Sequence, residues 1–86
     1  MEVSREIPIS DDHRIQVGKS SWDNGADRSV RSAYYRDNNQ FNYAGSAEVS
    51  TSDLIEMVRF AVETMHFSEQ ELKELDSINQ RVVQLQ

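Results

Sequence analysis

Two turn signals in the first half of the chain constrain its fold more than any other feature. Asp23-Asn24-Gly25 contains Asn-Gly, which supplies the two positive-φ positions of a type I′ hairpin turn. Asp37-Asn38-Asn39-Gln40 is a second run of turn-forming polar residues. If both are two-residue hairpin loops, the flanking strands run antiparallel, and each loop fixes which residues lie opposite each other.

The two registers agree on one apolar face. The first loop places Ile15 opposite Tyr34, and the second places Tyr34 opposite Tyr43. Directly opposed residues share a face of the sheet. The expected apolar face therefore consists of Ile15, Val17, Val30, Tyr34, Phe41 and Tyr43. The other face is expected to carry Gln16, Arg31, Tyr35 and Asn42.

A further strand precedes these hairpins. Val3, Ile7 and Ile9 occupy alternate positions before a Ser10-Asp11-Asp12 turn, and Pro8 favours an edge strand because proline has no N–H for a ladder. With a last strand from Phe41 to Ala47, the first half predicts an antiparallel β-meander of about four strands over residues 2–47.

The second half carries two helix start signals. Ser50 is expected to cap one helix together with Asp53, and Ser68 with Glu71 repeats the pattern as a capping box. They predict helices at about 51–65 and 69–84, and without a glycine or proline at the join we expect only a slight break. The chain is thus expected to be a single α+β domain, residues 1–86, with a sheet part at 1–47 and a helical part at 48–86.

The second helix has a possible interface. Leu75, Ile78, Val82 and Leu85 follow the 3-4-3 spacing of a short coiled-coil seam. This stripe either closes over the sheet or forms a helix–helix interface with a partner or another copy, and the spacing leaves both open. A chain of 86 residues buries a modest core, so self-association would help it.

Charge and composition exclude several function classes. The net charge is −6, and residues 48–86 contribute −5 of it through three Lys/Arg and eight Asp/Glu. Such a surface is repelled by phosphate backbones and anionic membranes. There is no cysteine, which excludes disulfides, thiolate nucleophiles and zinc–thiolate sites and fits a reducing compartment. No signal peptide and no apolar run of about 20 residues is evident, so we expect a cytoplasmic protein without a membrane partner.

Catalytic patterns are absent. His13 and His66 are the only side chains with an unperturbed pKa near neutrality, and they lie far apart in the sequence. No glycine-rich phosphate loop or nucleophile elbow occurs. Asp11-Asp12-His13 is better interpreted as a turn than as a cation site. We expect a protein that is not an enzyme, with no catalytic, metal-binding or cofactor-binding residue and no cofactor.

Arginine and aromatic residues in the sheet region form the remaining candidate site. Exposed rings stack on bases while cations follow the backbone of single-stranded nucleic acid, and the same residue types anchor protein interfaces. The candidate binding residues are Trp22, Arg28, Arg31, Tyr35 and Arg36. Nearby aspartates offset much of their charge.

Residues 30–62 resemble one known family. Val30-Arg31, Tyr34-Tyr35, a polar turn, Gly45 and the capped helix start at Ser50-Thr51 are similar to the single-stranded-DNA-binding transcriptional coactivators typified by positive cofactor four. The resemblance implies a curved four-stranded sheet followed by a helix, and a dimer. Where that family is rich in lysine before its glycine, this chain has Asn42-Tyr43-Ala44.

Two functions follow as expectations. The first is a small protein-binding module, a regulator or inhibitor (of the phage type, for example) of a basic, nucleic-acid-handling protein. The second is a dimeric single-stranded nucleic-acid-binding transcription cofactor. The first has another protein as partner, and the second has nucleic acid and a homodimer.

Overall fold

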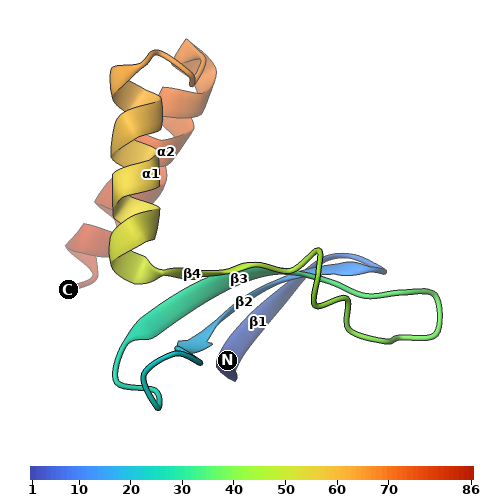
Figure 1. Cartoon of the computed structure of the whole chain (residues 1–86). Coiled ribbons are helices and arrows are strands. Elements are labelled where there is room, and N and C mark those ends of the chain that lie inside the picture. Colours follow the sequence, from blue (N-terminus) through green and yellow to red (C-terminus); the bar gives the residue numbers. More distant parts are fainter. The chain divides into compact units, whose positions relative to one another are not determined.

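The computed structural model describes all residues, 1–86, and has the predicted α+β architecture. Four antiparallel strands form one sheet in the order β1-β2-β3-β4, and two helices follow in the sequence (Figure 1). The elements are β1 Glu2–Ser10, β2 His13–Lys19, β3 Arg28–Tyr34, β4 Glu48–Ser50, α1 Thr51–Glu63 and α2 Glu69–Gln84. The chain divides into two compact units, Met1–Ile55 and Glu56–Gln86.

The β2–β3 register differs by two residues from the predicted one. Ile15 lies opposite Ser32, and Lys19 lies opposite Arg28. Asn24 and Gly25 do have positive φ, 56° and 80°, but they lie within a longer loop, residues 20–27. Because the shift is an even number of residues, Ile15, Val17, Val30 and Tyr34 still share one face, as predicted.

The longer loop has a local cause. The hydroxyl of Ser20 donates to the Asp23 carboxylate, which also accepts the N–H of Ala26 at 3.1 Å. The N–H of Ser20 donates to the Asp27 carbonyl at 3.0 Å and so closes the loop at its base. Asp23 therefore organises a wide turn in place of a two-residue one.

The predicted fourth strand is misplaced. Residues 41–47 contribute only an isolated bridge between Phe41 and Tyr35, whereas β4 begins at Glu48 and pairs Val49 with Val30. In the intervening segment the Ser46 hydroxyl accepts the Tyr34 N–H at 2.8 Å, where a strand would offer a carbonyl.

Two rings predicted for the apolar face are consequently elsewhere. The bridge places Phe41 with Tyr35, on the opposite side from Ile15 and Val17. Tyr43 is 83% exposed and contacts the edge of the Phe41 ring. The prediction that both rings lie on the apolar face is wrong. The pairing shift moves Phe41 by one residue and therefore to the other face, and Tyr43 lies outside the strands.

Both predicted helix starts are confirmed. The Ser50 hydroxyl accepts the N–H of Asp53 at 3.0 Å. At α2 the box is reciprocal, since Ser68 accepts the N–H of Glu71 at 3.1 Å and Glu71 accepts the N–H of Ser68 at 2.8 Å. The two helices thus begin where the serine signals predict them to begin.

The end of α1 needs no glycine. Met65 adopts a left-handed conformation with φ of 57°. The N–H groups of Met65 and His66 donate to the carbonyls of Val62 and Ala61, at 3.1 and 2.9 Å. This is a Schellman motif, which turns the chain out of α1 and into α2 (Figure 1). The prediction of only a slight break between the two helices is therefore wrong, because α1 ends completely before α2 begins.

β1 is an edge strand, as Pro8 predicts. The Tyr35 N–H donates to the Asp12 carbonyl, so even-numbered residues of β2 bond to β3 and odd-numbered ones to β1. Pro8 lies opposite Arg14, and its ring nitrogen therefore points away from the sheet. The outer edge lacks a donor at this position.

The buried interior is small and mostly polar. Ala33 is the one fully buried hydrophobic residue, and neither helix contains a buried residue. The buried polar residues are Gln16, Ser20, Ser29 and Ser46. Neither helix is long and apolar enough to cross a membrane. The hydrophobic side chains are consequently concentrated at the surface.

Candidate protein-binding surface

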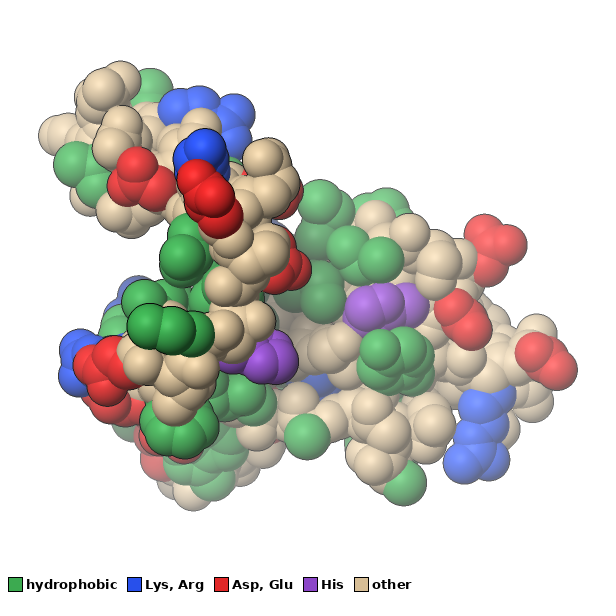
Figure 2. All heavy atoms as spheres, turned by 90° about the horizontal axis from the view of Figure 1, so that it is seen from above, with side chains coloured by type: hydrophobic (Ala, Val, Ile, Leu, Met, Phe, Trp, Pro, Cys, Tyr) green, Lys and Arg blue, Asp and Glu red, His purple; other side chains and the backbone are tan.

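One face of the sheet presents exposed or half-buried aliphatic and aromatic side chains. The strand registers bring together Ile7, Ile15, Val17, Val30, Tyr34 and Val49, which we call the apolar face. Ile7 is 58% exposed, Tyr34 41% and Val17 39%. Figure 2 shows hydrophobic side chains at the surface over the sheet as well as over the helices. Side chains of this kind are usually buried, so the face is suited to docking.

The apolar face is hollowed at its centre. A hollow of about 460 Å³ is lined by Val17 and Val30 with Lys19 and Arg28 beside them. A second hollow of about 260 Å³ is lined by Ile7, Ile15 and Val17, with Arg5 and Glu6 beside them. Val17 lines both hollows.

Three cations border these two hollows: Arg5 borders the smaller, and Lys19 and Arg28 border the larger. Arg5, Lys19 and Arg28 lie on the same side of the sheet as Val17 by register, and all three are exposed. None forms an ion pair, since the ion pairs of the sheet unit are Arg14 with Glu6 and the Met1 amino group with Glu48. Glu2, which lies opposite Lys19, is an exposed carboxylate on the same side, so the rim holds three cations and one carboxylate and is positive on balance. One predicted site residue, Arg28, belongs to this rim.

His13 fixes one end of the apolar face. Its ring stacks on the Tyr34 ring, with centroids 4.3 Å apart and an interplanar angle of 4°. Its Nε2 is 2.5 Å from the Ser32 hydroxyl. The stacked His13 ring restrains the Tyr34 ring, and a restrained ring loses less entropy when a partner packs on it.

The opposite face carries a cluster of hydrogen bonds and cation–ring contacts that we call the arginine–tyrosine cluster. Its members are Arg14, Gln16, Arg31, Tyr35 and Phe41. Buried Gln16 accepts from Arg31 Nε and Nη2 at 2.9 and 2.6 Å and donates to the Tyr35 hydroxyl at 3.2 Å. The Arg14 guanidinium lies 4.0 Å from the Tyr35 ring centroid, and that of Arg31 lies 4.4 Å from the Phe41 centroid. The cluster joins two predicted site residues, Arg31 and Tyr35, and occupies one ring face of each aromatic residue.

Sequence reasoning missed Gln16. A glutamine on the polar side of a strand has the pattern of a solvent-facing residue, yet it is only 2% exposed. Gln16 is buried because other strands bring rings and guanidinium groups over it. No local sequence pattern predicts this burial.

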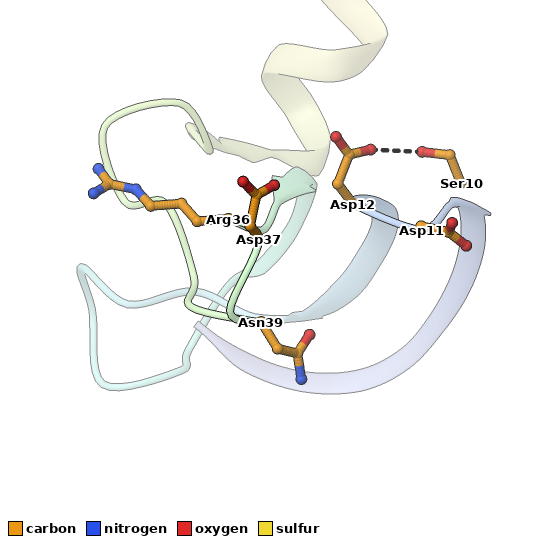
Figure 3. Close-up of a pocket in the computed structure, with 6 residues that line it drawn as sticks. All are labelled: Ser10, Asp11, Asp12, Arg36, Asp37 and Asn39. Atoms are coloured by element: carbon orange, nitrogen blue, oxygen red, sulfur yellow. Dashed lines mark hydrogen bonds between the residues drawn. The ribbon is translucent and has the colours of Figure 1, made fainter.

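The remaining predicted residues lie apart from these groups. Trp22 is 52% exposed in the loop of residues 20–27. Arg36 follows β3 and borders an open pocket of about 490 Å³ with Ser10, Asp11, Asp12, Asp37 and Asn39. Figure 3 shows the Arg36 side chain pointing away from Asp11 and Asp12, and the hydrogen bond drawn joins Ser10 to Asp12 at 2.8 Å. No group of three or more His, Asp or Glu residues is placed to hold a metal ion.

Glu48 fastens the loop of residues 20–27 to the sheet. Its carboxylate accepts the N–H and hydroxyl of Ser21, at 3.1 and 2.6 Å, and the hydroxyl of Ser29 at 2.6 Å. Partial burial raises the pKa of the Glu48 carboxyl, but these hydrogen bonds outweigh it and hold the pKa below its ordinary value of 4.5. Glu48 is therefore charged at neutral pH and links the loop to β4.

The predicted helix stripe is present and exposed. Leu75 and Ile78 are 39% and 44% exposed, and Val82 and Leu85 are more so. The stripe lies on α2 as expected, except that Leu85 is the residue that ends the helix.

Comparison with protein-family models, with curated proteins and with solved structures finds no match for this chain. The resemblance of residues 30–62 to the coactivator family therefore stays a prediction.

Proposed function

We propose that this chain is a small, non-enzymatic protein-binding module whose docking surface is the apolar face. The observation that carries the proposal is the contrast between the two sides of the sheet. One side is closed by the hydrogen bonds of Gln16, whereas the other leaves Ile7, Val17 and Tyr34 open to solvent. Burying such residues against a partner releases about 25 cal/mol for each Å² of apolar surface.

The charge of the helical half supports a further proposal about its role. Residues 48–86 carry −5, and acidic side chains stand at the start of both helices. Such a surface attracts a basic protein and competes for grooves that hold phosphate. We therefore propose a regulator or inhibitor of a basic, nucleic-acid-handling protein, acting in a reducing compartment such as the cytoplasm.

Single-stranded nucleic acid is the second candidate ligand. Arginine and aromatic residues on one side of the sheet favour it. However, the guanidinium groups of Arg14 and Arg31 already lie over the rings of Tyr35 and Phe41, and Arg31 is committed to Gln16. A nucleic acid would have to displace these contacts, so we rank this function second.

Capture from nuclease-treated extract of the source cell tests the first proposal. We expect the wild-type chain to retain a partner protein and the Val17→Asp variant to lose it, because a carboxylate would lie in the centre of the apolar face. Asn38→Asp adds the same charge at an exposed turn and should behave like wild type. Circular dichroism of both variants checks their folding. Equal capture by both variants would exclude the apolar face as the docking surface.

A titration of labelled oligonucleotides over a range of salt concentrations tests the second candidate. We expect no saturable binding, even at low salt. Binding that weakens steeply with salt and is abolished by Arg31→Ala would instead favour the nucleic-acid function.

A further inference from the structure

The apolar face specifies the chemistry of the partner that can dock on it. Its centre is aliphatic, and its rim holds the unpaired cations Arg5, Lys19 and Arg28. The complementary surface has an apolar stripe with carboxylates beside it. An acidic amphipathic helix provides this arrangement.

α2 is such a helix. Leu72, Leu75, Ile78 and Val82 form a stripe along it, and all are exposed. Its first two turns are acidic, and Glu74, next to the stripe, forms no ion pair. The chain thus carries both an apolar face with a positive rim and an apolar helix with negative charge.

We propose that α2 of a second copy of this chain covers the apolar face. The inference rests on the proposed function, since it names the partner that the docking surface receives. A two-fold axis places each α2 on the sheet of the other copy, so both contacts form at once and the assembly closes as a dimer. This contact does not use the acidic residues of α1, which are Asp53, Glu56 and Glu63. Their negative charge therefore stays available to attract a basic protein.

Charge reversal on each side of the contact tests the proposal. One variant carries Lys19→Glu with Arg28→Glu, and the other carries Glu74→Lys with Asp76→Lys. We expect wild type to sediment as a dimer and each variant alone to dissociate at least tenfold more readily, because like charges then face each other twice. An equimolar mixture of the two variants should restore the dimer, since both of its contacts pair opposite charges.

The controls separate this arrangement from its alternatives. Asp11→Lys with Asp37→Lys changes the net charge as the α2 variant does, but away from the apolar face, and should leave the dimer intact. A helix–helix dimer would be insensitive to the sheet variant, and a contact within one chain would not be restored by mixing. Either result, or a strict monomer, overturns the inference.

Sedimentation and partner capture together distinguish a wrong dimer contact from a wrong docking surface. A wild-type monomer that still captures a partner protein, and loses it with Val17→Asp, keeps the docking surface but gives it a different occupant. A monomer without such capture contradicts both.

Discussion

At the residue scale, backbone conformation separates what the sequence predicts from what it does not. Asn24 and Gly25 have the positive φ that an Asn-Gly pair predicts, because these residues tolerate the left-handed region. Met65 has a φ of 57° with no such signal. A methionine has no preference for this conformation, so only the hydrogen bonds of the helix end enforce it, and the sequence could not show it.

Met65→Gly should stabilise the protein. Glycine removes the steric cost of a left-handed conformation at this helix end, worth about 1 kcal/mol. Met65 is 90% exposed, so little packing is lost. Urea unfolding measures the gain. Thr64→Gly, one residue earlier and without positive φ, is the matched control and should destabilise the protein; a loss of stability in Met65→Gly itself would contradict the Schellman interpretation.

Gly18→Ala should destabilise the sheet. A Cβ at this position would lie 1.9 Å from the carbonyl oxygen of Glu2, a backbone atom that cannot move aside cheaply. We expect a cost of about 1–3 kcal/mol and faster hydrogen exchange of β1 amides. Gly45→Ala is the control, since its Cβ meets only the flexible Asn42 side chain. Equal effects of the two substitutions would argue against the close approach of β1 and β2.

At the element scale, the sequence predicts the strand faces better than the strand ends. The alternation of Ile15 and Val17 survives a register shift of two residues, because side-chain direction has a period of two. The width of the loop of residues 20–27 could not be predicted, since it depends on hydrogen bonds of Ser20 and Asp23 that compete with a tight turn. The helices are predicted well because their capping signals are local.

The contacts of Glu48 make β4 sensitive to acid. Its folded pKa is lowered, so its contribution to stability is present above the unfolded value of about 4.5 and is lost as the pH falls through the folded pKa. Glu48→Gln should therefore lower the free energy of unfolding by about 1–3 kcal/mol at neutral pH. Urea unfolding of both proteins between neutral pH and about pH 3 is the measurement. A difference that does not shrink on acidification would show that the charge of Glu48 is not what holds the loop.

At the scale of the whole molecule, the short chain correctly suggests a modest core, and the structure has one buried hydrophobic residue, Ala33. The sequence also anticipates a sheet part and a helical part. It places the division at 47/48, whereas the compact units meet at 55/56, because α1 begins within the first unit. Which surface is used could not be predicted, since the apolar face and the arginine–tyrosine cluster exist only once the strands are paired.

Thermal stability should depend on protein concentration. If two copies complete each other's apolar surfaces, mass action raises the midpoint of unfolding as the concentration rises. Differential scanning calorimetry over a hundredfold concentration range measures this shift. The Lys19→Glu/Arg28→Glu variant is expected to show a smaller dependence, and a wild-type midpoint that is independent of concentration would contradict self-association.

Pro8 affects how readily this protein aggregates at high concentration. A nine-residue edge strand with exposed Val3 and Ile7 is a template onto which unfolded chains can add, layer after layer, into amyloid. Because the nitrogen of Pro8 faces outward with no hydrogen, an incoming chain loses a bond near the end of the edge strand. Replacing this one proline would be the shortest route from a discrete assembly to an insoluble fibre.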